Sequence, residues 1–187
     1  MFSVRLLTLA AVSFLAATAA ASCDSTEGPQ LFCYTDGDSI PQEVDVADVK
    51  FVASYLRSYG AQTQAGRQFV MLAADTPNCE EYTLYQRGTV LALGKHLVPT
   101  VNSSVLFADI ANTIDGGANA TPEQQLAALV GCAEAGGSFG VVYNASNPQY
   151  NTATYTSKGY TPDGIIMIKY YHTTFGTVAI SGDDVVR

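Results

Sequence analysis

Two histidines, His96 and His172, are the natural candidates for general acid and base chemistry in this chain. They lie 76 residues apart, so only folding could bring them together. The sequence contains no H-x-x-x-H pair and no cluster of cysteine with histidine, the spacings that typically bind zinc. It also lacks the G-x-S-x-G turn of a serine hydrolase, and the nearest text, residues 136–140 (GGSFG), is typical of a helix stop followed by a strand. We therefore expect no catalytic residue, no cofactor and no metal site.

Tyrosines offer a different kind of site. Six of the eleven fall in the last 45 residues, and Tyr150, Tyr155 and Tyr160 stand in a polar stretch rich in Thr and Asn. Exposed tyrosines in such surroundings are typical of protein contacts and of sugar-stacking surfaces. The sequence predicts a candidate binding surface at these three residues, with the alternative that the rings simply cover the sheet.

The N-terminus has the features of a secretory signal peptide over residues 1–22. A single cation, Arg5, precedes the apolar run Leu6–Ala17, and small residues follow it. The run is shorter than the roughly 20 apolar residues that span a bilayer, so no membrane anchor is expected after cleavage. Residues 20–23 (AASC) are also compatible with a bacterial lipoprotein box, in which Cys23 would carry a lipid. The first interpretation predicts a secreted, extracellular protein.

Four cysteines follow the cleavage region: Cys23, Cys33, Cys79 and Cys132. An even number in an exported protein predicts two disulfide bonds, for which three pairings are possible. We favour Cys23 with Cys33 and Cys79 with Cys132, because the second pair closes a long loop. Three sequons, at Asn102, Asn119 and Asn144, would carry glycans on surface turns in a eukaryotic secretory route, or would be unmodified loop asparagines.

Charge excludes some partners. The chain carries 17 acidic and 9 basic residues and a net charge of −8, with a pI near 4.5. Such a surface repels phosphate backbones and anionic lipids, so nucleic-acid binding and a membrane-surface role are disfavoured. We expect a monomer.

The elements that must position any site follow from hydrophobic periodicity. Asp45 predicts the start of a helix over 46–59 that Gly60 ends, and Ser103 or Ser104 predicts a second helix that reaches Ile114. A third helix is expected from Thr121, with Gln124 completing a capping box, to its end at Gly136-Gly137. Strands are expected at 68–73, 82–86, 89–93, 139–143, 165–171 and 177–181.

This order of elements does not alternate strand and helix, which argues against a parallel doubly wound sheet. The sequence predicts an α+β fold, an antiparallel sheet of about five strands with about three helices packed on one face. We expect residues 23–187 to form one domain, in which 23–44 is a loose lead-in.

The signal peptide, the four cysteines and the stretches SSVLFADIANTIDGG and CAEAGGSFGVVYN resemble the small secreted, cysteine-containing effector-like proteins of filamentous ascomycete fungi, loosely those of the necrosis-inducing extracellular type. The resemblance implies a non-enzymatic, virulence-associated protein that binds a host protein or a cell-wall glycan. It also implies a small α/β sandwich like that of secreted killer toxins. No functional residue carries over from it.

Two alternatives stay open. The chain resembles, in composition, the small guanyl-specific ribonucleases of filamentous fungi. The side chains that such an enzyme uses could come from its strands: Glu81, Tyr82 or Tyr85, Arg87, His96 and His172. The other is a killer-toxin-like antimicrobial protein. A ribonuclease would require the two histidines, a carboxylate and Arg87 to converge in a cleft, whereas the negative net charge counts against a membrane-active toxin.

Overall fold

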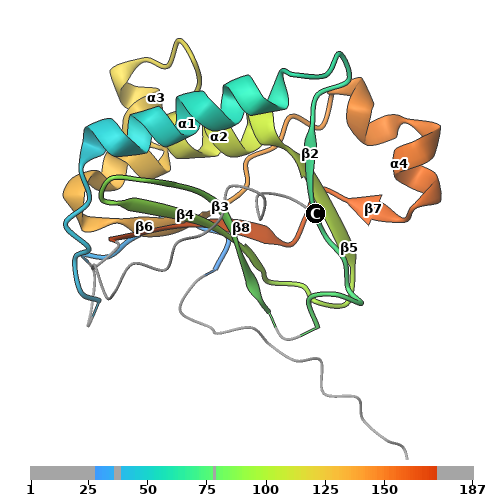
Figure 1. Cartoon of the computed structure of the whole chain (residues 1–187), viewed down its shortest axis with the longest axis horizontal. Helices are drawn as coiled ribbons and strands as arrows, with labels where there is room; N and C mark the ends of the chain where they lie inside the picture. Colours follow the sequence, from blue (N-terminus) through green and yellow to red (C-terminus); the bar gives the residue numbers. More distant parts are fainter. Residues whose placement is uncertain (1–27, 36–38, 78, 172–187) are drawn as a thin grey trace, which may run out of the picture.

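The computed structural model describes residues 28–35, 39–77 and 79–171 (Figure 1). The expected signal peptide, Cys23, His172 and the expected strand 177–181 lie outside the described residues. The elements in chain order are β1 (Phe32–Cys33), α1 (Val46–Gly60), β2 (Gln68–Met71), β3 (Glu81–Arg87), β4 (Val90–His96), β5 (Asn102–Leu106), α2 (Phe107–Asp115), α3 (Pro122–Leu126), the 3-10 helix η1 (Leu129–Ala135), β6 (Gly137–Gly140), the 3-10 helix η2 (Pro148–Asn151), α4 (Ala153–Ser157), β7 (Tyr160–Thr161) and β8 (Ile165–Tyr171).

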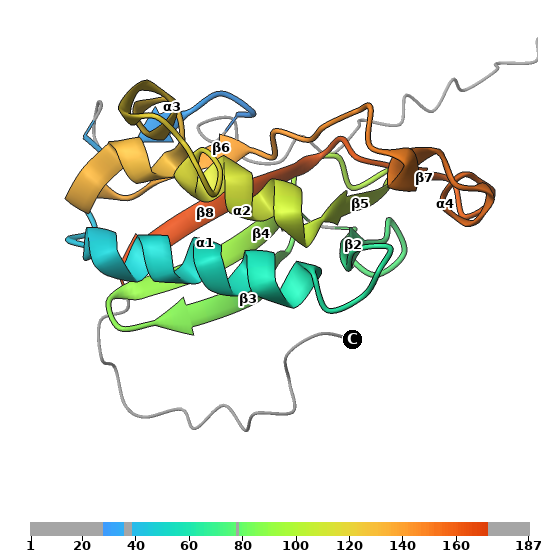
Figure 2. The same ribbon diagram turned by 90° about the horizontal axis from the view of Figure 1, so that it is seen from above.

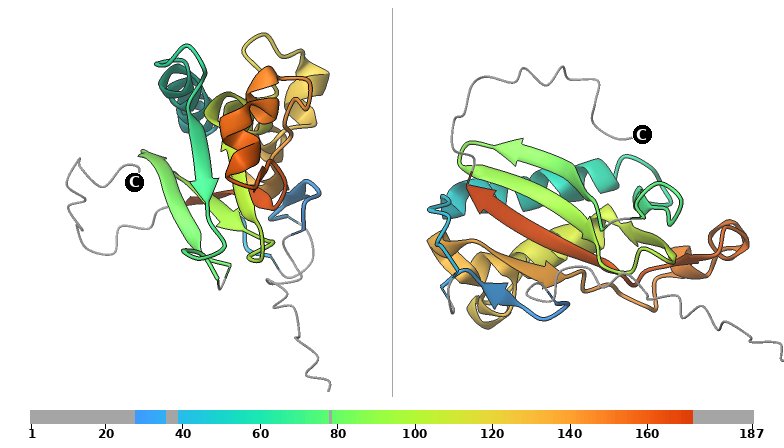
Figure 3. Two further views of the ribbon diagram at one scale, coloured as in Figure 1. Left: turned by 90° about the vertical axis from the view of Figure 1, so that its right-hand side faces the viewer. Right: turned by 90° about the horizontal axis from the view of Figure 1, so that it is seen from below.

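Two sheets organise these elements. The larger has five strands in the order β1-β6-β8-β4-β3, and all of its neighbouring strands are antiparallel. The smaller has the order β2-β5-β7, in which β5 and β7 are parallel. Helices α1 and α2 lie side by side across one face of the larger sheet (Figure 2), and a view from below shows the strands in front with both helices behind them (Figure 3). The predicted α+β fold with a five-stranded antiparallel sheet is confirmed.

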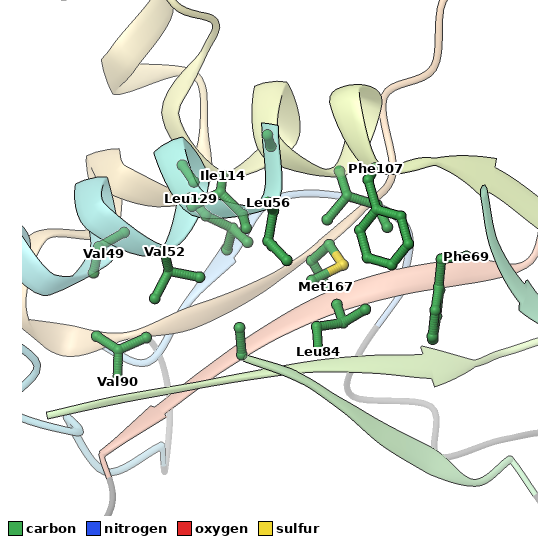
Figure 4. Close-up of a cluster of buried hydrophobic side chains, with 14 of the residues drawn as sticks. Val49, Val52, Leu56, Phe69, Leu84, Val90, Phe107, Ile114, Leu129 and Met167 are labelled. Atoms are coloured by element: carbon green, nitrogen blue, oxygen red, sulfur yellow. The ribbon is translucent and has the colours of Figure 1, made fainter. Parts of the chain in front are cut away.

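The main core fills the space between the helix pair and the larger sheet (Figure 4). Helix α1 contributes Val49, Val52 and Leu56 at helical spacing, and these face Met167 of β8 and Val90 of β4. Each of these side chains is almost fully buried. Burial of a large aliphatic side chain contributes about 1.5–3 kcal/mol, so this layer is the main source of stability.

Local sequence signals locate several elements well. Asp45 caps α1 by accepting a hydrogen bond from the Ala47 amide at 2.7 Å. The predicted hairpin forms as β3 and β4, which are joined at Gly88-Thr89. The predicted strand 165–171 coincides with β8.

The predicted second helix begins later than expected. Ser103 and Ser104 lie in β5, which pairs with β2 on one side and β7 on the other. Helix α2 therefore starts at Phe107, with no side-chain cap, and the Phe107 amide donates to the Arg67 carbonyl instead. Sheet pairing outweighs the local preference of serine for a helix start.

The predicted third helix is interrupted. The capping box between Thr121 and Gln124 forms as expected, but α3 ends at Leu126 and the chain continues as the 3-10 helix η1. A Cβ at Gly131 would overlap the Leu126 carbonyl, so glycine permits the close approach of the end of α3 and η1. Ala133, inside η1, adopts a left-handed φ of 49°.

The disulfide framework differs from the favoured pairing. Cys132 bonds to Cys33, across a sequence separation of 99 residues, and not to Cys79. The pairing follows from the sheet: β1 lies next to β6, directly after η1, so Cys33 and Cys132 face each other with Cα atoms 5.2 Å apart. Cys79 is also disulfide-bonded. The loop that the Cys33–Cys132 bond closes spans most of the domain.

We expect the double variant Cys33→Ala, Cys132→Ala to lose about 4 kcal/mol of unfolding free energy, because the loss of a cross-link over about 100 residues frees the unfolded chain. Urea unfolding followed by fluorescence measures this loss, and the intact mass verifies that the Cys79 disulfide remains. An unchanged urea midpoint would show that this bond does not stabilise the domain.

Candidate functional site

A row of aromatic and arginine side chains lies where α1 crosses the edge of the larger sheet. We call it the aromatic array and define it as Phe51, Tyr55 and Tyr59 of α1, Tyr85 of β3, and two arginines, Arg87 and Arg67. The three α1 rings repeat every four residues, so they occupy one side of the helix. β3 is the last strand of its sheet, which places Tyr85 and Arg87 beside that side of α1.

The rings are stacked on one another. The Tyr55 and Tyr85 centroids are 3.8 Å apart with planes 21° apart, and Phe51 lies 6.4 Å from Tyr85 at 27°. Tyr59 continues the row at 6.4 Å from Tyr55, with planes 12° apart. The ring faces are thus turned toward each other.

An arginine lies over each end of the row. The Arg87 guanidinium carbon lies 4.4 Å from the Phe51 centroid, and that of Arg67 lies 4.5 Å from the Tyr59 centroid. Arg67 also donates a hydrogen bond from Nη1 to the Tyr59 hydroxyl at 3.1 Å. Cations over aromatic faces contribute about 0.5–1 kcal/mol each at exposed sites, so both ends of the array are held in place.

Two local features bring Tyr85 and Arg87 to α1. The pairing of β3 with β4 shifts register between Thr83 and Tyr85, and this β-bulge allows both Leu84 and Tyr85 to pack against the core. The hairpin turn is then fastened to α1 by Asp48, which accepts hydrogen bonds from the amide and hydroxyl of Thr89 at 2.9 and 3.2 Å.

Exposure distinguishes the two ends of the array. Phe51 is 43% exposed and the Arg87 side chain is 54% exposed, whereas the three tyrosines and Arg67 are half-buried. The Phe51 end therefore offers an apolar ring beside a cationic group that faces solvent. Sequence reasoning missed this site because Phe51 and Tyr55 lie outside the apolar stripe of the predicted helix; their spacing of four residues was the available signal.

The predicted tyrosine surface has a different place in the structure. Tyr150 and Tyr155 are 6% and 3% exposed, and Tyr160 is half-buried, so the expectation of an exposed surface is wrong for the first two. Edge-to-face contacts of 5.5 Å join Tyr150 to Tyr155 and Tyr155 to Tyr160. The alternative interpretation, in which these rings cover the fold, describes Tyr150 and Tyr155.

Buried hydrogen bonds explain why these tyrosines turn inward. The Tyr150 hydroxyl donates to Asp109 Oδ2 at 2.5 Å and accepts from the Leu106 amide at 3.0 Å, while the Tyr155 hydroxyl donates to the Ser104 carbonyl at 2.7 Å. Burial, followed by the hydrogen bond to Asp109, raises the pKa of Tyr150 well above its usual value. Burial likewise raises the pKa of Tyr155. Both rings stay neutral hydroxyl donors that tie residues 150–155 to β5 and α2.

His96 lies at the end of β4 and is fully buried. Its Nδ1 is 2.5 Å from Thr76 Oγ1, and its Nε2 is 3.0 Å from Ser103 Oγ. A serine hydroxyl against an imidazole resembles a nucleophile with its base, but Ser103 and Thr76 are also fully buried, so a substrate has no access to them. Burial lowers the pKa of His96, outweighing the hydrogen bonds and the charge of Glu80 that raise it.

Among the described residues of the ribonuclease alternative, Tyr85 and Arg87 lie away from His96. Glu81 lies at the His96 end of the hairpin, where it pairs with Lys95 at 3.4 Å. Arg87 lies at the other end of the hairpin, opposite Val90. At the rise per residue of an extended strand, it is about 20 Å from Glu81. Tyr85 belongs to the aromatic array, and His172 lies outside the described residues.

A shallow hollow of about 410 Å³ opens beside the Cys33–Cys132 disulfide. Glu43 and Glu134 are its ionisable lining residues, and the rest of its lining is mostly apolar. In the described part of the chain, no group of three His, Cys, Asp or Glu side chains could hold a metal ion.

The three sequons differ in accessibility. Asn119 and Asn144 are exposed in loops. Asn102, expected on a turn, instead lies in β5, where Oδ1 accepts from the Ala73 amide at 3.1 Å and Nδ2 donates to the Lys158 carbonyl at 3.4 Å. One N–H of the Asn102 amide thus points to the Lys158 carbonyl, so Asn102 is part of the packing between β5 and the loop after α4.

Comparisons with known proteins add no family to this description: no family model, no curated protein and no solved structure matches the chain significantly. Among the residues described, none of the helices is both long and apolar enough to cross a membrane.

The lowered pKa of His96 predicts loss of stability in mild acid. The unfolded histidine takes up a proton below about pH 6.5, whereas the buried one resists it, so the unfolded state binds more protons and is favoured as the pH falls. We expect the thermal midpoint to drop between pH 7.5 and 5, and the drop to be smaller in His96→Gln. A matched His172→Gln variant separates the two histidines; an equal drop in wild type and His96→Gln would contradict the assignment.

Removal of the Tyr150 hydroxyl should destabilise the fold. Tyr150→Phe leaves the buried Asp109 carboxylate without its donor and the Leu106 amide without its acceptor, so we expect a loss of about 1–3 kcal/mol in urea unfolding. The control is Tyr143→Phe, whose hydroxyl donates to Asp163 at 3.2 Å in an exposed position. Equal effects of the two variants would argue against a structural role for the buried pair.

Proposed function

We propose that this chain is a secreted, non-enzymatic protein that binds a host protein or a cell-wall glycan through the aromatic array. The observation that carries the proposal is the Phe51 end of the array, where a 43% exposed phenylalanine lies under an exposed guanidinium. Aromatic residues and arginine are the side chains most enriched in binding hot spots.

The array is suited to binding because it is already ordered. Stacking holds Phe51, Tyr85 and Tyr55 in one arrangement, and Asp48 anchors the turn that follows Arg87. A partner therefore need not immobilise these side chains, which lowers the entropic cost of association. A pre-ordered aromatic and cationic surface of this kind favours a binding role.

Secretion is supported by two features. The N-terminal pattern of a cation, an apolar run and small residues is typical of a signal peptide. The Cys33–Cys132 disulfide, with Cys79 also bonded, is typical of proteins that fold in an oxidising compartment. The resemblance to fungal effector-like proteins points the same way.

The test uses the full chain, expressed in a secreting eukaryotic host and purified from the medium. We expect a mature N-terminus between residues 19 and 23. Labelled protein is then titrated onto immobilised cell-wall polysaccharides and onto extracellular host proteins. Phe51→Ala should weaken binding at least tenfold. It should lower the unfolding free energy by only about 1 kcal/mol, because the ring is 43% exposed and loses one cation–π contact and one stacking contact.

Leu126→Ala is the matched control, since Leu126 is 70% exposed on α3, outside the array. Retention of the protein inside the cells would contradict secretion. Absence of wild-type binding to both kinds of surface, or equal binding by wild type and Phe51→Ala, would overturn the proposed site.

A further inference from the structure

The Arg87 guanidinium has N–H groups that donate no hydrogen bond to any described residue. Its guanidinium lies over Phe51, and its nearest carboxylate oxygen, Asp48 Oδ1, is 3.8 Å from Nε, beyond hydrogen-bonding distance. The other oxygen of Asp48 is engaged by Thr89. Among the described residues, no group accepts a hydrogen bond from Arg87, and its side chain is 54% exposed.

Stacking prepares such an arginine for one kind of ligand. A guanidinium that lies over a ring uses its face, and the N–H donors in its plane stay available. Two of these donors match the two oxygens of a carboxylate, which gives a bidentate, charge-assisted pair. Lysine, as a point charge on a flexible chain, offers no equivalent geometry.

The rings beside Arg87 argue for a protein partner and against a sugar. A sugar ring stacks on a free aromatic face, but the faces of Tyr55 and Tyr85 are turned to each other at 3.8 Å and Arg87 covers Phe51. Ring edges carry partial positive charge and favour acceptor groups and apolar side chains. The exposed chemistry is therefore cationic and apolar together.

Charge around α1 is consistent with this choice. The chain is strongly acidic, yet four of its nine basic residues lie on α1 or against it: Lys50, Arg57, Arg67 and Arg87. Arg57 is paired with Asp115 at 2.7 Å, whereas Lys50 is exposed one residue before Phe51. Lys50 and Arg87 thus place two cations near Phe51, where Asp48 offsets part of the charge of Arg87. Cations at this place complement an acidic segment and orient its approach.

We propose that the Phe51 end of the aromatic array binds an acidic segment of a partner protein, with a carboxylate paired to the Arg87 guanidinium and an apolar side chain against Phe51. This inference rests on the proposed function and names the class of partner for the same site.

The probe is a short synthetic peptide rich in glutamate around one phenylalanine, and its control replaces each glutamate by glutamine. Binding is measured by calorimetry and by shifts of the aromatic NMR signals. We expect the glutamate peptide to shift the Phe51 signals and the glutamine peptide to bind about tenfold more weakly or not at all. Arg87→Lys should weaken the glutamate peptide about tenfold, since it keeps the charge but loses the fork.

Charge reversal supplies the matched control. Arg87→Glu should weaken binding about thirtyfold or more, whereas Lys158→Glu changes the net charge equally at a different surface, where Lys158 lies 5.5 Å from the Tyr160 centroid. Lys158→Glu should leave binding nearly unchanged. Equal losses in both variants, or equal binding of the two peptides, would overturn the inference, because attraction would then be general and not directed by Arg87.

Polygalacturonate tests the anionic glycan as the other source of carboxylates. If it binds in an Arg87-dependent way and the peptide does not, the partner is a glycan and this inference fails while the proposed binding function stands. If Phe51→Ala loses a natural partner that Arg87→Glu retains, the array is a binding site but not one for an acidic segment. Near-UV circular dichroism verifies that each variant is folded.

Discussion

The hydrogen bonds from Thr89 to Asp48 set the position of α1 against the β3–β4 hairpin, and both the core and the aromatic array depend on that position. A Cβ at Gly88 would overlap the Asp48 carboxylate, so glycine, with its φ of 48°, permits the contact. With the turn held there, Val49, Val52 and Leu56 face the sheet. The same placement sets Tyr85 against Tyr55, so one polar contact aligns the buried side of α1 and its aromatic side together.

Away from α1, polar side chains connect the remaining elements. Residues 148–161 form only short helices and a two-residue strand, which bury few aliphatic groups. Tyr150 compensates by reaching Asp109 in α2, and Tyr155 by reaching a carbonyl of β5. His96 of β4 similarly contacts Ser103 of β5 in the smaller sheet and Thr76 in the loop after β2. Unpaired polar groups in such positions would cost about 1–3 kcal/mol each, so these contacts also specify one arrangement of the segments.

The sequence predicted the elements whose signals are local and missed those decided by distant pairing. Helix 46–59, the hairpin and strand 165–171 follow from periodicity and turn residues within a few positions. Ser103 and Ser104 do not cap a helix because their segment pairs with β2 and β7 as strand β5. Cys132 bonds to Cys33 because β1 lies next to β6. The polar residues around Tyr150 predicted an exposed ring, because its buried partner, Asp109, lies 41 residues away in the sequence. The array, which joins α1 to a bulged edge strand, could be anticipated only in part.

The composition of the array explains why an arginine, and not a lysine, ends it. A guanidinium can lie flat on Phe51 and keep its donors in the plane of the group, so packing and recognition do not compete. The nearby Asp48 restrains Arg87 without consuming those donors, because its second oxygen serves Thr89. In a molecule with a net charge of −8, an arginine without these contacts could pair with a nearby carboxylate. The contacts with Phe51 and Asp48 keep Arg87 at the surface instead. The contact that orders the hairpin therefore also keeps the exposed cation available.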